Sequence, residues 1–322
     1  MESLTPHFPL IKTETPKSKS HFAMSALAAV RIAPAPERRH VRSSIRGKAR
    51  RVAATSASVP ASGAELLSSI EIDSPGWSGG YGTGGKVWSS SRVLCDFLVD
   101  VAAGVEDCGG FEFQGARVVE LGSGTGVVGI ACAALGASTV VLTDGGSKSL
   151  LKLSEENAAK NIGKAKTIDP EATTMTVSGY KWGQSPLPAK LANSAPYDLI
   201  IGSDCTYAVG GHGALCDAIV DLTKCGDDDE KNEKNDPSKN EKNEPCVILA
   251  HQHRTLAAAL AGRGSKGWGV DPNLTMFIET AKKRGLKVEE IRVTKLAWHG
   301  LRNVSVLLVT RRAREEETTS ST

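Results

Sequence analysis

The chain has 322 residues, 40% of them hydrophobic and 5% aromatic, which excludes a mainly disordered protein and fits one large α/β domain with appendages. Its +3 charge is unevenly distributed, because residues 1–62 hold 11 of the 39 basic residues and 3 of the 36 acids. The remainder is mildly acidic, so the basic balance gives no indication of nucleic-acid binding. No apolar run reaches the roughly 18 residues of a membrane span, and seven scattered cysteines without a C-x-x-C pair indicate reduced thiols.

Residues 1–62 have the composition of a targeting segment. They are rich in Arg, Ser and Ala, poor in acids, and lack the continuous apolar region of a secretory signal. This pattern predicts an organellar transit peptide, and the Ser/Ala balance favours the chloroplast over the mitochondrion. The alternative is an ordinary disordered basic tail on a cytoplasmic protein. We expect a disordered segment over 1–62, a folded domain over 63–312 and a flexible tail over 313–322.

From residue 116 onward, buried strands alternate with amphipathic helices. The expected strands are 116–121, 139–144, 173–180, 198–204 and 246–251, and the expected helices are 126–137, 148–161, 213–224 and 272–285. Five strands that alternate with four helices in this way predict a parallel sheet with helices on both faces. Two last strands, 286–293 and 303–310, have no helix between them and predict an antiparallel hairpin at one edge. The expected fold is a three-layer α/β, Rossmann-like domain with seven mostly parallel strands and a reversed C-terminal strand.

A charged segment interrupts this domain at 226–245. It contains eight acids, four lysines and no apolar side chain. Because such a segment cannot offset the entropy of ordering, we expect a solvated, disordered insertion. A functional acidic patch is the alternative.

The stretch "VVELGSGTGVVG" (118–129) places glycines where the first strand turns into the following helix. Glycine at such a turn permits positive φ and close approach of a ligand to the backbone, and the helix start offers free N–H groups. In one frame, Gly124, Gly126 and Gly129 match the dinucleotide pattern G-x-G-x-x-G, with Asp144 twenty residues on as the ribose ligand. That frame predicts a nicotinamide-dinucleotide oxidoreductase.

A second frame, E-x-G-x-G-x-G, is formed by Glu120, Gly122, Gly124 and Gly126. This is the S-adenosylmethionine loop of Rossmann-like methyltransferases. We favour it because an acid before the glycines would repel a pyrophosphate, whereas S-adenosylmethionine has no phosphate and a positive sulfonium. A dinucleotide-binding fold would also have a second mononucleotide-binding half, whereas this chain is expected to end in a hairpin at the sheet edge. Asp144 can accept hydrogen bonds from the ribose hydroxyls in either frame.

Four motifs carry a resemblance to a known family. They are "GGKVWSSSRVLCDFL" (84–98), "VVELGSGTGVVGIA" (118–131), "SGYKWGQSPL" (178–187) and "YDLIIGSDCTY" (197–207). In this order and spacing, the chain resembles the seven-strand protein-lysine methyltransferases of methyltransferase family 16, of the methyltransferase-like 21 type. The resemblance implies S-adenosylmethionine as cofactor and a lysine of a protein as methyl acceptor.

The resemblance also implies a set of cofactor-binding residues around the glycine loop. Trp88 would lie beside the methionine end of the cofactor, Asp144 would hold the ribose, and Trp182 would stack on the adenine. The remaining implied contacts are Glu120, Gly122, Ser123, Gly124 and Ser203. Core packing is the alternative role for each tryptophan.

The strand at 198–204 ends on Asp204, and Tyr207 follows three residues later. A lysine with a pKa near 10.4 is charged at neutral pH and must lose a proton before it can attack a methyl group. We expect Asp204 to attract the ammonium, orient it and assist its deprotonation. Tyr207 would offer a ring face and a hydroxyl for alignment. The alternative is an Asp that only caps the following turn.

Two segments depart from the family pattern, the insertion at 226–245 and the stretch after the fifth strand, 250–272. His251 and His253 in the second form an H-x-H pair, which could hold a metal but without further ligands indicates two polar residues at a strand end. We expect a monomer without metal, nucleic acid or membrane as a partner. The alternative functions are a small-molecule N- or O-methyltransferase on the same fold and a non-catalytic binding module.

Overall fold

The computed structural model describes residues 59–77, 80–163, 168–224, 245–254, 271–296 and 303–312. Most of the predicted segment 1–62, nearly all of the predicted insertion 226–245 and the tail 313–322 lie outside the described residues. Within the described ranges, none of the helices combines the length and the apolarity needed to cross a bilayer.

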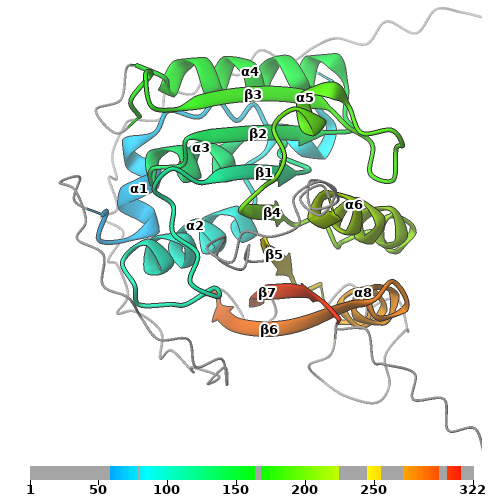
Figure 1. The fold of residues 1–322 in the computed structure, drawn as a ribbon. Coiled ribbons are helices and arrows are strands. Elements are labelled where there is room, and N and C mark those ends of the chain that lie inside the picture. Colours follow the sequence, from blue (N-terminus) through cyan, green and yellow to red (C-terminus); the bar gives the residue numbers. More distant parts are fainter. Residues whose placement is uncertain are drawn as a thin grey trace, which may run out of the picture. The chain divides into compact units, whose positions relative to one another are not determined.

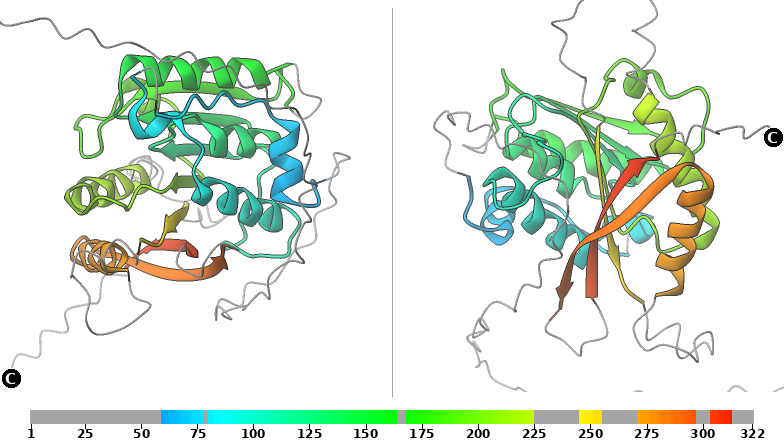
Figure 2. Two further views of the ribbon diagram at one scale, coloured as in Figure 1. Left: turned by 180° about the vertical axis from the view of Figure 1, so that it is seen from behind. Right: turned by 60° about the horizontal axis from the view of Figure 1, so that its bottom comes forward.

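A single sheet of seven strands forms the centre of the domain, in the order β3-β2-β1-β4-β5-β7-β6 (Figure 1). The strands are β1 (Arg117–Leu121), β2 (Thr139–Asp144), β3 (Thr174–Gly179), β4 (Leu199–Ser203), β5 (Cys246–Gln252), β6 (Leu286–Lys295) and β7 (Asn303–Arg311). Strands β1 to β5 pair in parallel, whereas β7 runs antiparallel to both β5 and β6 (Figure 2). The predicted seven-strand α/β fold with a reversed last strand is confirmed.

Helices cover both faces of the sheet. They are α1 (Gly63–Ser69), α2 (Ser89–Ala102), α3 (Val127–Ala134), α4 (Lys148–Asn161), α5 (Ala189–Ala192), α6 (His212–Lys224) and α8 (Pro272–Lys283). Helices α1, α2 and α3 pack in one apolar core and α6 and α8 in the other, which gives three layers. Two short 3-10 turns, η1 (Gly82–Gly85) and η2 (Val209–Gly211), lie before α2 and α6. The sequence patterns did not predict α1, α5 or these turns.

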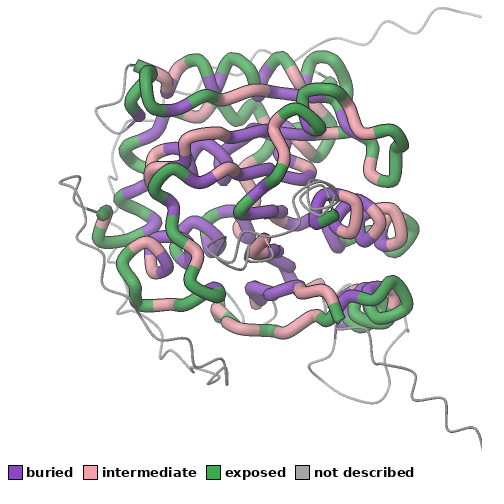
Figure 3. Tube along the Cα trace, viewed as in Figure 1, coloured by how far each residue is buried: buried purple, intermediate pink, exposed green. Residues whose placement is uncertain are grey.

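The central strands are apolar on both sides because each side faces a helical layer. In β4, Leu199 and Ile201 belong to one core and Ile200 to the other, and all three are fully buried. Such two-sided burial removes the alternation of polar and apolar residues that a half-exposed strand shows. Figure 3 shows this burial along the central strands, with exposed residues along the outer sides of the helices.

The order of the sheet fixes where a ligand can bind. The chain moves outward from β1 through β2 to β3, then returns to β4 on the other side of β1. The carboxyl ends of β1, β2 and β4 therefore meet at one edge, at the point where the strand order reverses. Open parallel sheets bind their ligands in the crevice at such a point.

Two buried asparagine side chains of α4 form hydrogen bonds with the backbone of Glu71 and Asp73, in the segment that precedes α2. Asn157 accepts a hydrogen bond from the Asp73 N–H at 2.9 Å and donates to the carbonyls of Asp73 and Thr125 at 3.1 and 2.9 Å. One helical turn further, Asn161 makes the same pair of bonds with the backbone of Glu71. Because Thr125 lies in the glycine loop after β1, Asn157 ties that loop to the segment beside it.

We predict that Asn157→Ala lowers the free energy of unfolding by about 2–4 kcal/mol, because it leaves several buried backbone groups without partners. The measurement is urea unfolding of the full chain. Glu155→Ala on the exposed side of the same helix is the control and should change stability by less than about 0.5 kcal/mol. Equal effects of the two substitutions would show that the amide does not hold the segment.

Candidate functional site

A cavity of about 710 Å³ lies at the carboxyl ends of β1, β2 and β4. Its volume falls within the range of pockets that bind small molecules and cofactors. Nine of the ten residues predicted for the site line it, namely Trp88, Gly122, Ser123, Gly124, Asp144, Trp182, Ser203, Asp204 and Tyr207. Residues from four loops thus converge on one space, as the sheet order requires.

The glycine loop forms a cradle in which side chains would not fit. Gly122 and Gly124 have φ values of 67° and 53°, which disfavour residues with a Cβ. A Cβ on Gly122 would lie 3.0 Å from the Cys205 sulfur and 3.1 Å from the Trp182 ring, and one on Gly124 would lie 2.7 Å from a backbone oxygen of Gly84. The loop can therefore pack this closely against Cys205, Trp182 and Gly84 only while these two residues are glycines.

Asp144 at the end of β2 is held by the backbone on both of its oxygens. Its Oδ2 accepts from the Gly124 N–H at 3.0 Å and its Oδ1 from the Gly146 N–H at 2.7 Å. Burial raises the pKa of this carboxyl, and the two N–H groups oppose the rise. A carboxylate oxygen can accept more than one hydrogen bond, so both oxygens can also accept from hydroxyl groups of a ligand.

Glu120 does not line the cavity, unlike the other predicted residues. Its Oε2 accepts from the Gly129 N–H at 2.8 Å, and its side chain is buried beneath the glycine loop. Burial raises the pKa of Glu120 to about 8, the Gly129 N–H opposes the rise, and the charge of Asp144 adds to it. Glu120 therefore does not contact the cavity itself but holds the backbone at the start of α3, next to the glycine loop.

Two tryptophans bound the cavity. Trp88, at the start of α2, donates from its indole nitrogen to the carbonyl of Thr83 at 3.0 Å and meets the ring of Trp77 edge to face at 5.7 Å. The Lys86 ammonium lies 4.9 Å from the centre of the Trp88 ring. Trp182 lies against Gly122 from the loop after β3. Trp77 also lines the cavity, although its sequence surroundings gave no signal for a role there.

Two serine hydroxyls from separate elements meet at the cavity wall. Ser91 of α2 and Ser203 at the end of β4 lie 2.6 Å apart, oxygen to oxygen. A third hydroxyl, that of Ser123 in the glycine loop, is buried without a hydrogen-bond partner among the described residues. Because buried hydroxyls are normally paired, the Ser123 oxygen is a polar group left available to a ligand.

Asp204 directly follows β4 and has a left-handed backbone with φ of 57°. Its N–H donates to the Ala250 carbonyl at 2.8 Å, which anchors the residue to β5, and the residue is 6% exposed. Its Oδ2 accepts from Arg254 at 2.6 Å. Its Oδ1 is buried and has no partner among the described residues.

Arg254 is a site residue that the sequence patterns missed. It lies just beyond β5, and its guanidinium carbon lies 5.5 Å from the centre of the Tyr207 ring. Tyr207 itself is 47% exposed, at the open side of the cavity. The available signal was a cation that follows shortly after the expected strand 246–251.

Behind Asp204 lies a buried polar network around the predicted H-x-H pair. His251 contacts Thr206 Oγ1 through Nδ1 at 2.6 Å and Asp271 Oδ2 through Nε2 at 3.1 Å, and His253 Nε2 contacts Ser305 Oγ at 2.6 Å. His251, His253 and Asp271 lie close enough to share an ion. Because both ring nitrogens of His251 already have protein partners, the cluster is better explained as a hydrogen-bonded support.

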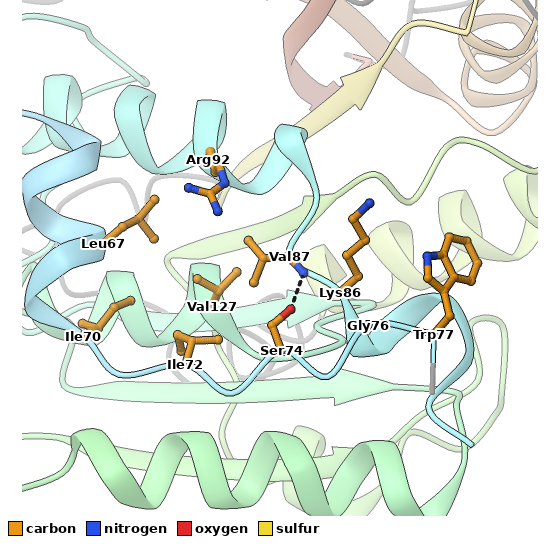
Figure 4. A pocket seen from close by; sticks show the side chains of 10 residues that line it. All are labelled: Leu67, Ile70, Ile72, Ser74, Gly76, Trp77, Lys86, Val87, Arg92 and Val127. Carbon is orange, nitrogen blue, oxygen red and sulfur yellow. Dashed lines mark hydrogen bonds between the residues drawn. The ribbon is translucent and has the colours of Figure 1, made fainter. Parts of the chain in front are cut away.

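A second hollow of about 540 Å³ lies between α1 and the start of α2 (Figure 4). Aliphatic side chains such as Leu67 and Ile72 form much of it, and it shares Trp77 and Lys86 with the larger cavity. The Ser74 hydroxyl in it accepts from the Val87 N–H at 3.1 Å. None of its described lining residues is an acid, so the hollow lacks a general base.

Residues 74–228 match the profile of a protein family described as lysine methyltransferase. Protein N-lysine methyltransferase METTL21A of Danio rerio is 34% identical over 144 residues, which cover 44% of this chain and 56% of that protein. Protein-lysine N-methyltransferase EFM6 of Saccharomyces cerevisiae is 29% identical over 179 residues, 51% of this chain and 67% of that protein. The chain thus spans about half to two thirds of the length of these curated relatives.

Similarity to solved structures is weaker. The magnesium protoporphyrin IX methyltransferase of Synechocystis, solved with bound SAH, aligns with 69% of this chain and 83% of its own chain at 14% identity and a TM-score of 0.42. A likeness of this size bears on neither the site nor the substrate.

We predict that Glu120→Gln flattens the pH dependence of stability between pH 4.5 and 8. In the unfolded chain Glu120 ionises above its ordinary pKa of 4.5, whereas in the folded protein its pKa is about 8. Ionisation therefore favours unfolding increasingly over this interval, by up to about 1.4 kcal/mol per pH unit, and the effect levels off above pH 8. Gln keeps an acceptor for the Gly129 N–H but cannot ionise.

The measurement is the free energy of unfolding in urea at several pH values for the wild type and for Glu120→Gln. The stability of the variant relative to the wild type should increase as the pH rises. Glu155→Gln, at an exposed site, serves as the control and should give a curve parallel to that of the wild type. Parallel curves for Glu120→Gln as well would contradict the raised pKa.

Proposed function

We propose that this protein uses S-adenosylmethionine to methylate a lysine side chain of another protein. Its residues 74–228 match the lysine methyltransferase family, which confirms the resemblance predicted from its motifs. One observation carries the proposal. Asp204, whose Oδ1 has no hydrogen-bond partner among the described residues, lines the same cavity as the glycine cradle formed by Gly122 and Gly124. A donor and an amine can therefore meet in one space.

The cavity has the groups that S-adenosylmethionine requires. The cradle accommodates a ligand against the backbone, the Ser123 hydroxyl lacks a partner among the described residues, and the Asp144 oxygens can accept from ribose hydroxyls. Trp88 and Trp182 supply aromatic faces at the cavity wall. When bound, S-adenosylmethionine supplies an electrophilic methyl group on a positively charged sulfur.

The hydrogen bonds of the loop argue against the dinucleotide alternative. In the G-x-G-x-x-G frame, the pyrophosphate would lie against the backbone of the turn that holds Gly124, Gly126 and Gly129, where N–H groups should be available to it. Here they donate instead to Asp144, to the Ser123 carbonyl and to Glu120, at 3.0, 2.8 and 2.8 Å. The glycines are thus satisfied by the protein, which supports a ligand without phosphate.

At the other end of the cavity, Asp204 and Tyr207 form the acceptor site. A lysine with a pKa near 10.4 requires roughly 4–5 kcal/mol to lose its proton at pH 7. The free oxygen of Asp204 can accept a hydrogen bond from the amine and aim its lone pair, and positioning of this kind supplies much of the acceleration in a displacement reaction. The Tyr207 ring, half exposed at the mouth, can guide the aliphatic stem of the lysine.

Three features support a protein as the acceptor. The relatives in Danio rerio and Saccharomyces cerevisiae are named for lysine in proteins. Tyr207 and Arg254 at the site are both partly exposed, which allows a side chain of a large molecule to reach Asp204. The mildly acidic composition beyond residue 62 gives no indication of nucleic-acid binding. We further propose that the protein acts as a monomer and, from the composition of residues 1–62, that it acts in the chloroplast.

To test this proposal, the full chain is incubated with S-adenosylmethionine labelled in its methyl group and with either a plastid or a cytosolic extract. We expect label in one protein band of the plastid extract, on a lysine side chain when located by mass spectrometry. Asp204→Asn should reduce the initial rate at least about a hundredfold, because an amide cannot take up the proton that the ammonium must lose. Asp217→Asn, on α6 and paired with Arg284, is the matched control and should retain the wild-type rate.

Other outcomes would separate the alternatives. Label confined to small molecules would favour a small-molecule methyltransferase. Label on the N-terminal amine of a protein would contradict the lysine side chain as the methyl acceptor. A band found only in the cytosolic extract would contradict the chloroplast. Unchanged labelling by Asp204→Asn would remove Asp204 from the chemistry.

A further inference from the structure

We propose that Arg254 is a positioning residue that binds one oxygen of Asp204, leaves the other for the acceptor amine, and makes that amine shed its proton more readily. This inference rests on the proposed function of the site. It concerns a cation that already lies against the two groups, a carboxylate and an aromatic ring, that would otherwise receive the ammonium of a lysine.

The two oxygens of Asp204 have different surroundings. Oδ2 accepts from Arg254 Nη2 at 2.6 Å, and Oδ1 is buried without a partner among the described residues. A pair of this geometry, with the carboxylate almost wholly buried, is a charge-assisted hydrogen bond rather than a surface contact. While Arg254 keeps its place on Oδ2, Oδ1 is the oxygen that remains to receive a hydrogen bond from the amine.

Arg254 is anchored as a fixed part of the site rather than as a gate. Its backbone N–H donates to Asp271 Oδ2 at 2.6 Å, its Nη1 donates to the Gln252 carbonyl at 3.0 Å, and its Nη2 donates to Asp204. The side chain is only 28% exposed. To swing away, it would have to break two of these bonds and leave a buried carboxylate without compensation, which is costly.

Asp271, which anchors the backbone of Arg254, is buried and accepts three hydrogen bonds. Asp271 accepts from the Asn273 N–H at the start of α8, from the Arg254 N–H and from His251 Nε2. Burial acts to raise the pKa of Asp271, but these hydrogen bonds lower it well below its usual range, so the carboxylate stays charged. His251 in turn contacts Thr206, two residues after Asp204. A closed ring of contacts thus connects Arg254 back to the chain that carries Asp204.

The charge of Arg254 changes what an amine experiences at Oδ1. An unpaired carboxylate would stabilise an ammonium and keep it protonated, whereas a carboxylate paired with a guanidinium presents nearly no net charge. A neighbouring charge within about 4–6 Å changes a pKa by roughly 1–3 units, so Arg254 should lower the pKa of the bound amine. The neutral amine is the form that can attack.

Several other ionisable groups surround this pair. Lys86, Lys181 and Asp144 line the same cavity, Tyr207 and Cys205 adjoin Asp204, and His212, His251, His253 and Asp271 pack behind it. Burial raises the pKa of the Cys205 thiol well above its usual value, so it remains uncharged. Among these groups, Arg254 is the cation whose contact with Asp204 the structure shows.

The step is balanced with the groups named. The lone pair of the neutral amine forms the new nitrogen–carbon bond, the carbon–sulfur bond of the donor breaks, and the donor leaves as a neutral thioether. The proton that the ammonium gives up beforehand passes through Asp204 Oδ1 to water. Arg254 exchanges no proton, and its effect is electrostatic.

The first test is the pH profile of methyl transfer in the extract assay for the wild type, Arg254→Met and Arg254→Lys. We expect Arg254→Met to be slow at neutral pH and to recover as the pH rises, with its profile displaced by about one unit or more toward alkaline pH. Arg254→Lys, which retains a charge, should lie between the two. Arg284→Met, which removes an equally short ion pair with Asp217 outside the cavity, is the matched control.

The second test measures binding without the methyl donor. n-Butylammonium is titrated into each protein and followed by NMR, with n-butanol as the uncharged probe. We expect Arg254→Met to bind n-butylammonium at least about fivefold more tightly than the wild type, because the cation can take the place left between Asp204 and Tyr207. Binding of n-butanol should not change.

The outcomes distinguish this inference from the proposed function. If the wild type transfers methyl groups but Arg254→Met shows the same loss at every pH and no gain in n-butylammonium binding, Arg254 is only structural and the inference is wrong. If the wild type transfers no methyl group to protein, the proposed function fails, while the binding test still reports whether Arg254 neutralises Asp204.

Discussion

A carboxylate buried at the end of a strand is the constraint on which this site depends. Removing a charge from water costs far more than a strand end can offset, so a compensating cation or hydrogen bonds must be supplied. Here the neighbouring strand β5 supplies Arg254, and the pairing of β4 with β5 brings the two within 2.6 Å. Asp204, in a left-handed conformation, lines the cavity, and its second oxygen is buried without a partner among the described residues.

Gly122 lies between two parts of the cavity wall, the Trp182 ring and the chain next to Asp204. A Cβ at this position would meet the sulfur of Cys205, beside the acceptor acid, and the ring of Trp182 at the other side. In the proposed function, the glycine turn after β1 therefore borders both the space for the donor and the residue next to Asp204. Asn157 and Glu120 support this turn from behind through Thr125 and Gly129, without entering the cavity.

Periodicity and strand order were sufficient to predict the sheet and the edge where the site lies. Buried runs such as 198–204 and 246–251 mark strands, and parallel strands must end at one edge, so the convergence of Asp144 and Asp204 was predictable. Arg254 was not, because its role depends on the pairing of β4 with β5 and on an anchor, Asp271, seventeen residues away. For Glu120 the motif predicted the residue but not its role. The sequence did not indicate that its side chain accepts a hydrogen bond from the backbone of α3 instead of lining the cavity.

The measurement that tests the central claim most directly is calorimetry of the full chain with two ligands, S-adenosylmethionine and NAD⁺. A sulfonium donor that rests on the glycine cradle should give a saturable heat of binding with about one site per chain. NAD⁺ should give none, because the N–H groups of Gly124, Gly126 and Gly129 already donate to protein acceptors. Heat with NAD⁺ and none with S-adenosylmethionine would contradict the account.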